Sequence, residues 1–90
     1  MRLDKFLKIS RLIKRRTIAK EVADQGRIEI NGRKAKASSD LAVGDELTIQ
    51  FGHTRLTVKV ESLKEHIRKD EAGMLYSIIK EEKVESTEGN

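Results

Sequence analysis

The chain has 90 residues, no cysteine and a formal net charge of +4. This length fits one small domain, and the lack of cysteine excludes disulfides, thiol catalysis and thiolate metal sites. No apolar run is long enough to span a bilayer, and the first residues lack the apolar stretch of a signal peptide. We therefore expect a cytoplasmic protein without a membrane partner.

The distribution of charge is more informative than its sum. Residues 1–36 contain twelve Lys or Arg and four Asp or Glu, a net charge of +8, whereas residues 37–90 have a net charge of −4. A basic segment joined to an acidic remainder is typical of proteins that bind a polyanion on one face. The plainer interpretation is a solvated helix face, which the one-sided excess disfavours.

Two helices are predicted near the N-terminus, over residues 2–8 and about 16–24, with a turn over residues 10–16. In the first helix, Leu3, Phe6, Leu7 and Ser10 recur at helical spacing. The second has an apolar stripe of Ile18, Ala19, Val22 and Ala23, and Gly26 is a suitable stop. We expect these stripes to pack on the segment that follows.

Short strands follow the helices. Residues 27–30 alternate in polarity, Asn31-Gly32 is a strong hairpin signal, and residues 34–37 are the expected returning strand. Residues 46–51 and 55–60 also alternate. Over residues 70–83, the spacing of Ala72, Leu75, Ile78 and Ile79 predicts a C-terminal helix.

The predicted fold class is α+β, with two helices on a small antiparallel or mixed sheet and a further C-terminal helix. We divide the chain into an RNA-binding domain with its sheet extension over residues 1–62, a helical segment over 63–83, and a polar tail over 84–90 that we expect to fray.

The candidate RNA-binding residues are basic side chains concentrated around the two predicted helices and the Asn31-Gly32 turn. They are Arg2, Lys5, Lys8, Arg11, Lys14, Arg15, Arg16, Lys20, Arg33 and Lys34. An arginine fork holds a phosphate with two hydrogen bonds, and a helix start offers free N–H groups to the same ligand. A surface salt bridge to Asp4 or Asp24 is the alternative role for Arg16. We expect Asp4 to orient an arginine or cap the backbone, because a carboxylate repels phosphate.

Structured RNA is the expected ligand. The chain has only three aromatic residues, and Phe6 and Phe51 lie on predicted core faces. Proteins that read single strands stack bases on exposed aromatic side chains, so recognition of RNA shape and backbone fits better. No nucleophile-elbow serine, Gly-rich phosphate loop or metal-ligand cluster is visible. We therefore predict a protein that is not an enzyme and needs no cofactor.

The N-terminal half resembles the αL RNA-binding motif, the domain first defined in the fourth protein of the small ribosomal subunit. The matching residues, over about residues 1–51, are Arg2-Leu3-Asp4, Arg16, Ala19, Gly26, Ile28, Ile30, Asn31-Gly32, Val43-Gly44-Asp45 and Leu47. Arg15 departs from the pattern, because the family usually has Ser or Thr there. This substitution weakens the N-cap of the second helix and adds charge to the RNA face.

Within this family, MRLDKFLK and RRTIAKEVADQGRIEINGR are similar to the RNA-binding proteins of bacterial ribosome-associated quality control. The chain is also similar to heat-shock RNA-binding proteins that recognise stalled large subunits. The resemblance implies a monomer that binds obstructed large ribosomal subunits, contacts large-subunit rRNA and peptidyl-tRNA, and works with a tailing factor that adds alanine without mRNA.

Two alternatives remain open at this point. One is a ribosome-assembly or heat-shock RNA-binding protein of the same fold. The other is a protein-interaction adaptor that docks through an acidic C-terminal helix over residues 70–83.

Overall fold

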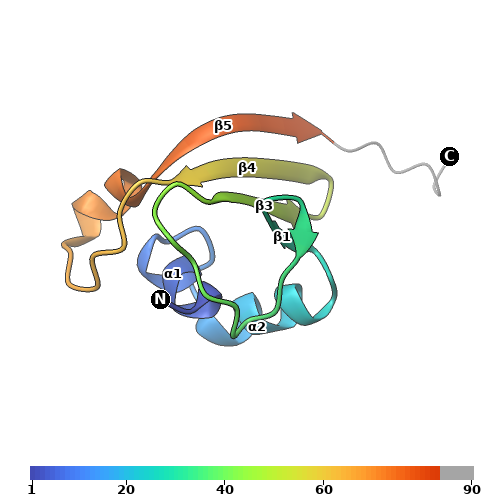
Figure 1. The fold of residues 1–90 in the computed structure, drawn as a ribbon, viewed down its shortest axis with the longest axis horizontal. Helices are drawn as coiled ribbons and strands as arrows, with labels where there is room; N and C mark the ends of the chain where they lie inside the picture. Colours follow the sequence, from blue (N-terminus) through green and yellow to red (C-terminus); the bar gives the residue numbers. More distant parts are fainter. Residues whose placement is uncertain (84–90) are drawn as a thin grey trace, which may run out of the picture.

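The computed structural model describes residues 1–83, apart from the side chain of Lys69. Two helices lie on one side of a five-stranded sheet (Figure 1). The elements in chain order are α1 (Leu3–Ile9), α2 (Arg16–Asp24), β1 (Ile28–Ile30), β2 (Arg33–Lys34), β3 (Glu46–Phe51), β4 (Thr54–Val60), the 3-10 helix η1 (Lys69–Leu75) and β5 (Tyr76–Lys83). The predicted α+β class, with two N-terminal helices on a small sheet, is confirmed.

Distant backbone caps the start of helix α1, where the N-cap residue Arg2 makes no side-chain hydrogen bond to the helix. The N–H groups of Leu3 and Asp4 donate to the carbonyl oxygens of Ser39 and Ala37, at 2.8 and 3.1 Å. These bonds satisfy donors that the first turn of a helix leaves free. They also explain why the predicted strand over residues 34–37 was too long: the chain leaves β2 after Lys34 to pass over the start of α1.

Helix α2 has the predicted bounds. Arg15 occupies its N-cap with an extended backbone and no side-chain hydrogen bond to the helix. The helix ends at Asp24, and Gly26 follows with a φ of 74°, a conformation that glycine adopts without strain. The expected weak N-cap and glycine stop are both present.

The sheet is antiparallel throughout, in the order β2-β1-β3-β4-β5. Asn31 and Gly32 have φ values of 53° and 84° between β1 and β2, as expected for a tight hairpin turn. The Asn31 side chain donates to Asp45 Oδ1 at 3.1 Å and accepts from the Glu46 N–H at 2.9 Å. The turn is thus joined to the start of β3.

The predicted C-terminal helix over residues 70–83 was wrong. Its first part forms the 3-10 helix η1, and Tyr76–Lys83 forms strand β5, which pairs with β4. Gly73 weakens a helix, and the β-branched pair Ile78-Ile79 favours a strand. The open edge of β4 supplies backbone partners for Tyr76–Lys83. The predicted fraying tail, residues 84–90, lies outside the described residues.

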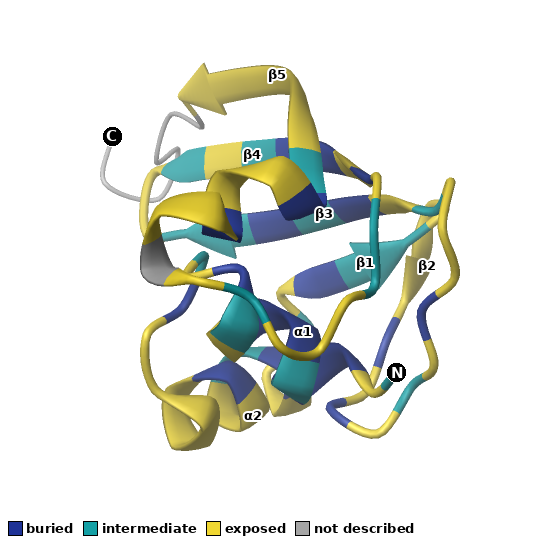
Figure 2. Ribbon diagram, turned by 90° about the vertical axis from the view of Figure 1, so that its left-hand side faces the viewer, coloured by how far each residue is buried: buried dark blue, intermediate teal, exposed yellow. Residues whose placement is uncertain are grey.

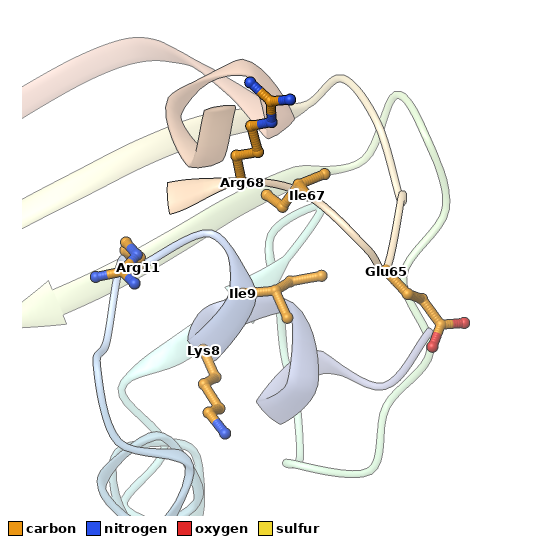
Figure 3. Close-up of a pocket in the computed structure, with 6 residues that line it drawn as sticks. All are labelled: Lys8, Ile9, Arg11, Glu65, Ile67 and Arg68. Carbon is orange, nitrogen blue, oxygen red and sulfur yellow. The ribbon is translucent and has the colours of Figure 1, made fainter. Parts of the chain in front are cut away.

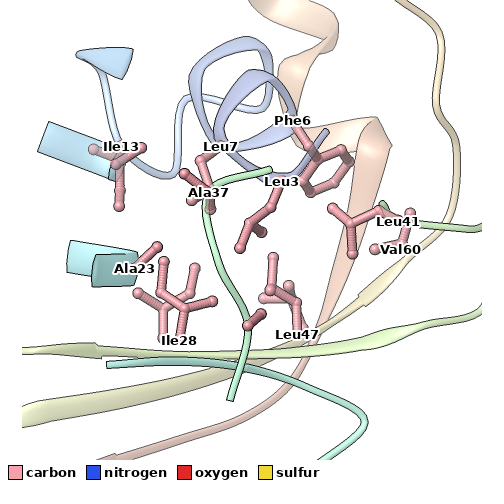
Figure 4. Packing of buried hydrophobic residues seen from close by; sticks show 14 of the residues in the cluster. Leu3, Phe6, Leu7, Ile13, Ala23, Ile28, Ala37, Leu41, Leu47 and Val60 are labelled. Carbon is pink, nitrogen blue, oxygen red and sulfur yellow. The ribbon is translucent and has the colours of Figure 1, made fainter. Parts of the chain in front are cut away.

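The core lies between the helices and the inner face of the sheet (Figures 2 and 4). Leu3, Phe6 and Leu7 of α1 are completely buried there. They face Ile28, Leu47, Ile49, Val58 and Val60, which come from β1, β3 and β4 and are equally inaccessible. Ile18, which the helical stripe of α2 assigned to the core, is instead 42% exposed.

Candidate nucleic-acid interface

Asp4, a buried carboxylate in the first turn of α1, joins two arginines from different elements. Its Oδ1 accepts a hydrogen bond from Arg2 Nε at 3.3 Å, and its Oδ2 forms a salt bridge with Arg16, whose Nε lies 3.2 Å away. Second contacts from Arg2 Nη2 and Arg16 Nη2 measure 3.4 Å each. Asp4 Oδ1 also accepts the N–H of Lys5 at 2.8 Å. Asp4 thus holds the start of α1 and the start of α2 together.

The charge of Asp4 is stabilised by these partners. Burial by itself raises the pKa of the Asp4 carboxyl. The hydrogen bond and charge of Arg16, the charge of Arg2 and the N–H of Lys5 outweigh burial and hold the pKa below its ordinary value of 3.8. Asp4 therefore remains ionised at neutral pH and does not contact solvent freely.

The two arginines remain available to a ligand although they are paired. The Arg2 side chain is 52% exposed and that of Arg16 is 47% exposed, against 5% for Asp4. A guanidinium has five N–H donors, so each arginine has donors left for a phosphate. The alternative role of Arg16 is observed, because it forms a salt bridge to Asp4. Its contact with RNA stays a prediction, for which the half-exposed fork is in a suitable position.

The start of α2 adds further positive charge. Lys14 and Arg15 are exposed just before the helix, and no acidic residue lies in its first turn. Lys20 is exposed one turn after Arg16 and lies on the same helix face, since residues four apart are neighbours. Free N–H groups, the helix dipole and four cations thus favour an anion at this end of α2.

Helix α1 presents the next group of cations. Lys8 is exposed in its last turn, on the same face as Asp4, and Arg11 follows in the loop. Lys5 makes a direct salt bridge to Glu65, far along the chain. The hydrogen bond from Lys5, followed by its charge, lowers the pKa of the Glu65 carboxyl. Lys5 is therefore already paired within the protein.

Arg33 and Lys34 are separated from this cluster. Both lie on β2 at the edge of the sheet, and the Lys34 side chain lies over Gly26, where an added Cβ would come within 3.5 Å of its Nζ. Gly26 follows the end of α2, and Arg16 begins it. The nine residues of α2 span roughly 13 Å, which separates Lys34 at the end of the helix from Arg16 at its start. Arg33 and Lys34 therefore extend the basic surface without joining the Asp4 cluster.

The segment between β4 and η1 belongs to this region, although the sequence did not indicate it. It supplies Glu65 to Lys5 and places Ile67 and Arg68 beside Lys8 and Arg11. Residues that are sixty positions apart along the chain and meet only in the fold leave no local sequence signal.

Membrane-spanning helices and metal clusters are absent from the described part of the chain. Within residues 1–83, no helix is long and apolar enough to cross a membrane. The same residues contain no cluster of three or more potential metal-ligating side chains.

The fold and the matched residues define the class of protein. The S4 domain matches residues 1–47. A solved structure of heat shock protein 15 from Vibrio cholerae, described as trimeric, superposes with a TM-score of 0.80 at 33% sequence identity and covers 87% of this chain and 80% of that one. The chain belongs to the S4 domain family.

The chain is also similar to several proteins over nearly its whole length. The chain is 67% identical to the RQC P-site tRNA stabilizing factor of Bacillus subtilis, over 93% of this chain and 98% of that protein. It is 56% identical to the factor of that name from Streptococcus pneumoniae, over 94% and 97% of the two chains. Heat shock protein 15 of Escherichia coli is 36% identical, and the match spans 98% of this chain but 64% of that protein.

Proposed function

We propose that this protein acts in ribosome-associated quality control. It binds obstructed large ribosomal subunits in the cytoplasm, contacts large-subunit rRNA and peptidyl-tRNA, and stabilises that tRNA. In this proposal a separate tailing factor adds alanine to the stalled chain without mRNA, so the protein itself is a binding factor and not an enzyme.

The Asp4-centred arginine pair is the observation that carries this proposal. It presents two oriented guanidinium groups beside the basic start of α2. Such a surface suits the phosphate backbone of folded RNA, whose shape is read mainly through phosphate and ribose contacts. The tRNA and quality-control parts of the proposal are supported by the names of the full-length relatives.

Replacement of Arg16 tests the proposal directly. Arg16→Ala, and the double variant with Arg2→Ala, should weaken co-sedimentation with large subunits that carry peptidyl-tRNA, by about tenfold for each arginine that no longer binds a phosphate. Arg55→Ala removes the same charge from an exposed position on β4 and is the matched control. If the double variant co-sediments like the control, the arginine pair does not bind the ribosome and the proposal fails.

A heat-shock or ribosome-assembly role of the same fold is the second candidate, favoured by the likeness to heat shock protein 15. The two roles differ in the particle bound. Recovery of the protein from cells should yield large subunits with tRNA and alanine-tailed chains under our proposal. Subunits without tRNA would favour the second candidate.

The adaptor hypothesis loses its structural basis, because residues 70–83 form a 3-10 helix and an edge strand rather than an acidic helix. Deleting the whole segment would also expose the edge of β4. The sharper test is Glu81→Lys with Glu82→Lys, two exposed positions on β5. We expect this variant to retain subunit binding.

We also propose that the protein acts as a monomer. Among the described residues, the exposed large apolar side chains Ile18, Val43, Met74, Ile78 and Ile79 are distributed over α2, the loop before β3, η1 and β5. Light scattering of the purified protein should give the mass of one chain. A threefold mass would match the trimer described for the Vibrio cholerae relative and contradict this proposal.

A further inference from the structure

A pocket outside the Asp4 cluster lies between the C-terminal end of α1 and the loop before η1 (Figure 3). It is lined by Lys8, Ile9, Arg11, Glu65, Ile67 and Arg68 and has a volume of about 190 Å³. Three of these side chains are cations. The only anion among them, Glu65, is neutralised by its salt bridge to Lys5. The pocket is therefore electropositive although it contains two isoleucines.

The two isoleucines give the pocket an apolar part. Ile9 and Ile67 are half-buried and pack against the main core. Figure 3 shows Ile67 close to Ile9, with Arg68 above them, Arg11 to the left and Lys8 below, and the charged ends of Arg68 and Lys8 directed away from the isoleucines. A site with an apolar centre and cationic margins suits a ligand that has both a flat hydrophobic ring and a phosphate.

The backbone on both sides of the pocket is held in place. Arg11 has a φ of 61°, an uncommon conformation for a residue with a side chain, and its N–H donates to the Lys8 carbonyl oxygen at 3.1 Å. Opposite, the Arg68 N–H donates to Glu71 Oε1 at 3.1 Å, and the Glu71 N–H donates to the Arg68 carbonyl oxygen at 3.0 Å. Neither set of bonds uses an arginine side chain, so the exposed guanidinium groups can turn toward a ligand in the pocket.

We infer that this pocket binds one unpaired nucleotide of the RNA. Its base packs against Ile9 and Ile67, and the exposed side chains of Arg11, Arg68 and Lys8 turn from their positions in Figure 3 to hold the adjoining phosphate. A cavity of about 150 Å³ accommodates a benzene ring, so the space here suits the single ring of a pyrimidine. The inference deepens the proposed function, since it rests on RNA being the partner.

The assignment also gives a role to the chain beyond the S4 domain match, which ends at residue 47. Ile67 and Arg68 belong to the later segment, whereas Lys8, Ile9 and Arg11 belong to the matched one. The paired arginines at Asp4 recognise phosphate alone. The pocket adds recognition of a base that protrudes from the folded RNA.

Uridine monophosphate is the direct probe. In a titration followed by NMR, it should shift the methyl signals of Ile9 and Ile67, with a dissociation constant on the order of millimolar because one nucleotide forms few interactions. Arg68→Gln should weaken this binding about fivefold, as expected for the removal of one charge-assisted hydrogen bond. Arg55→Gln, at an exposed position on β4, should leave it unchanged.

Binding to large subunits distinguishes RNA from a free nucleotide. Arg68→Gln should reduce co-sedimentation about fivefold relative to Arg55→Gln. The assignment is overturned if inorganic phosphate alone reproduces the methyl shifts, if the shifts are absent, or if Arg68→Gln affects uridine monophosphate but not subunits. Failure of the proposed function shows itself separately, as unchanged subunit binding by the Arg2 and Arg16 double variant.

Discussion

Asp4 shows how an acidic residue contributes to the proposed RNA-binding surface. Its carboxylate is buried at the junction of α1 and α2, where it accepts hydrogen bonds from Arg2, Arg16 and the Lys5 backbone. An exposed salt bridge adds little to stability, but removal of one partner from a buried pair leaves the other charge poorly compensated. Asp4 thus orients both arginines, which in the proposed function lowers the entropy cost of binding RNA.

Replacement of Asp4 by asparagine should affect both stability and binding. Asn retains an oxygen for the Lys5 N–H but removes the charge that holds Arg2 and Arg16. We expect the free energy of unfolding at about pH 7, measured by urea denaturation, to fall by about 1–2 kcal/mol. Subunit affinity should fall as well, since neither arginine remains oriented. Asp24→Asn, an exposed carboxylate at the end of α2, is the control and should not destabilise the fold.

The loss of stability in Asp4→Asn should depend on pH. Because the pKa of Asp4 is lower in the folded protein than its ordinary value of 3.8, the ionised form stabilises the fold. This stabilisation is fully present above about pH 5 and is lost as the pH falls through the folded pKa. The stability difference between the wild type and Asp4→Asn should therefore shrink between about pH 5 and pH 2. A constant difference would show that the charge of Asp4 is not its source.

At the scale of elements, the start of α2 combines a weak helix cap with a group of exposed cations that we propose binds phosphate. Arg15 provides no side-chain hydrogen bond to the helix, and Arg16 follows it directly. Ser or Thr at this position would satisfy an N–H group that is otherwise open to a ligand. The basic residue leaves this N–H free and adds a positive charge beside it, at some cost in stability.

Arg15→Thr should show whether Arg15 lowers stability in return for a stronger contact with RNA. We expect the free energy of unfolding to rise by about 1 kcal/mol, because the threonine oxygen caps α2. Arg15→Ala, which removes the charge without adding a cap, should give no such gain. Both variants should bind large subunits more weakly than the wild type. If Arg15→Thr stabilises the fold and binds subunits as tightly as before, Arg15 does not contribute to the RNA surface.

At the scale of the whole molecule, the N-terminal 36 residues carry a net charge of +8 and the remainder −4. The basic part forms both helices and the first hairpin, and the later part supplies most of the sheet. The charge separation along the chain thus becomes a separation between elements. In the proposed function, this separation steers the helical side of the domain toward RNA and disfavours binding through the acidic remainder.

The affinity for large subunits should depend steeply on salt. Binding to phosphates releases counterions, so an interface that neutralises about six phosphates weakens roughly a thousandfold between about 50 and 200 mM salt. Arg16→Ala should reduce the slope of the logarithmic plot by about one, and Arg55→Ala should leave it unchanged. A shallow slope in the wild type would contradict an interface built on Arg2, Arg16 and their neighbours.

The sequence by itself predicted the local elements well. The bounds of α2 and β3, the Asn31-Gly32 turn and the burial of Leu3, Phe6 and Leu7 follow from periodicity and turn chemistry. These signals act over a few residues, so they can be read along the chain. The concentration of cations around the two helices was also visible, because the basic residues are adjacent in sequence.

Only the tertiary structure decided the features that depend on distant partners. Strand β5 replaced the expected helix because β4 offers it an edge, and β2 ended early because the following segment caps α1. The structure also paired Lys5 with Glu65 and placed Arg68 and Arg11 in the lining of one pocket, which joins segments far apart along the chain. Local periodicity does not encode such pairings, since the backbone and charge partners are brought together only when the chain folds.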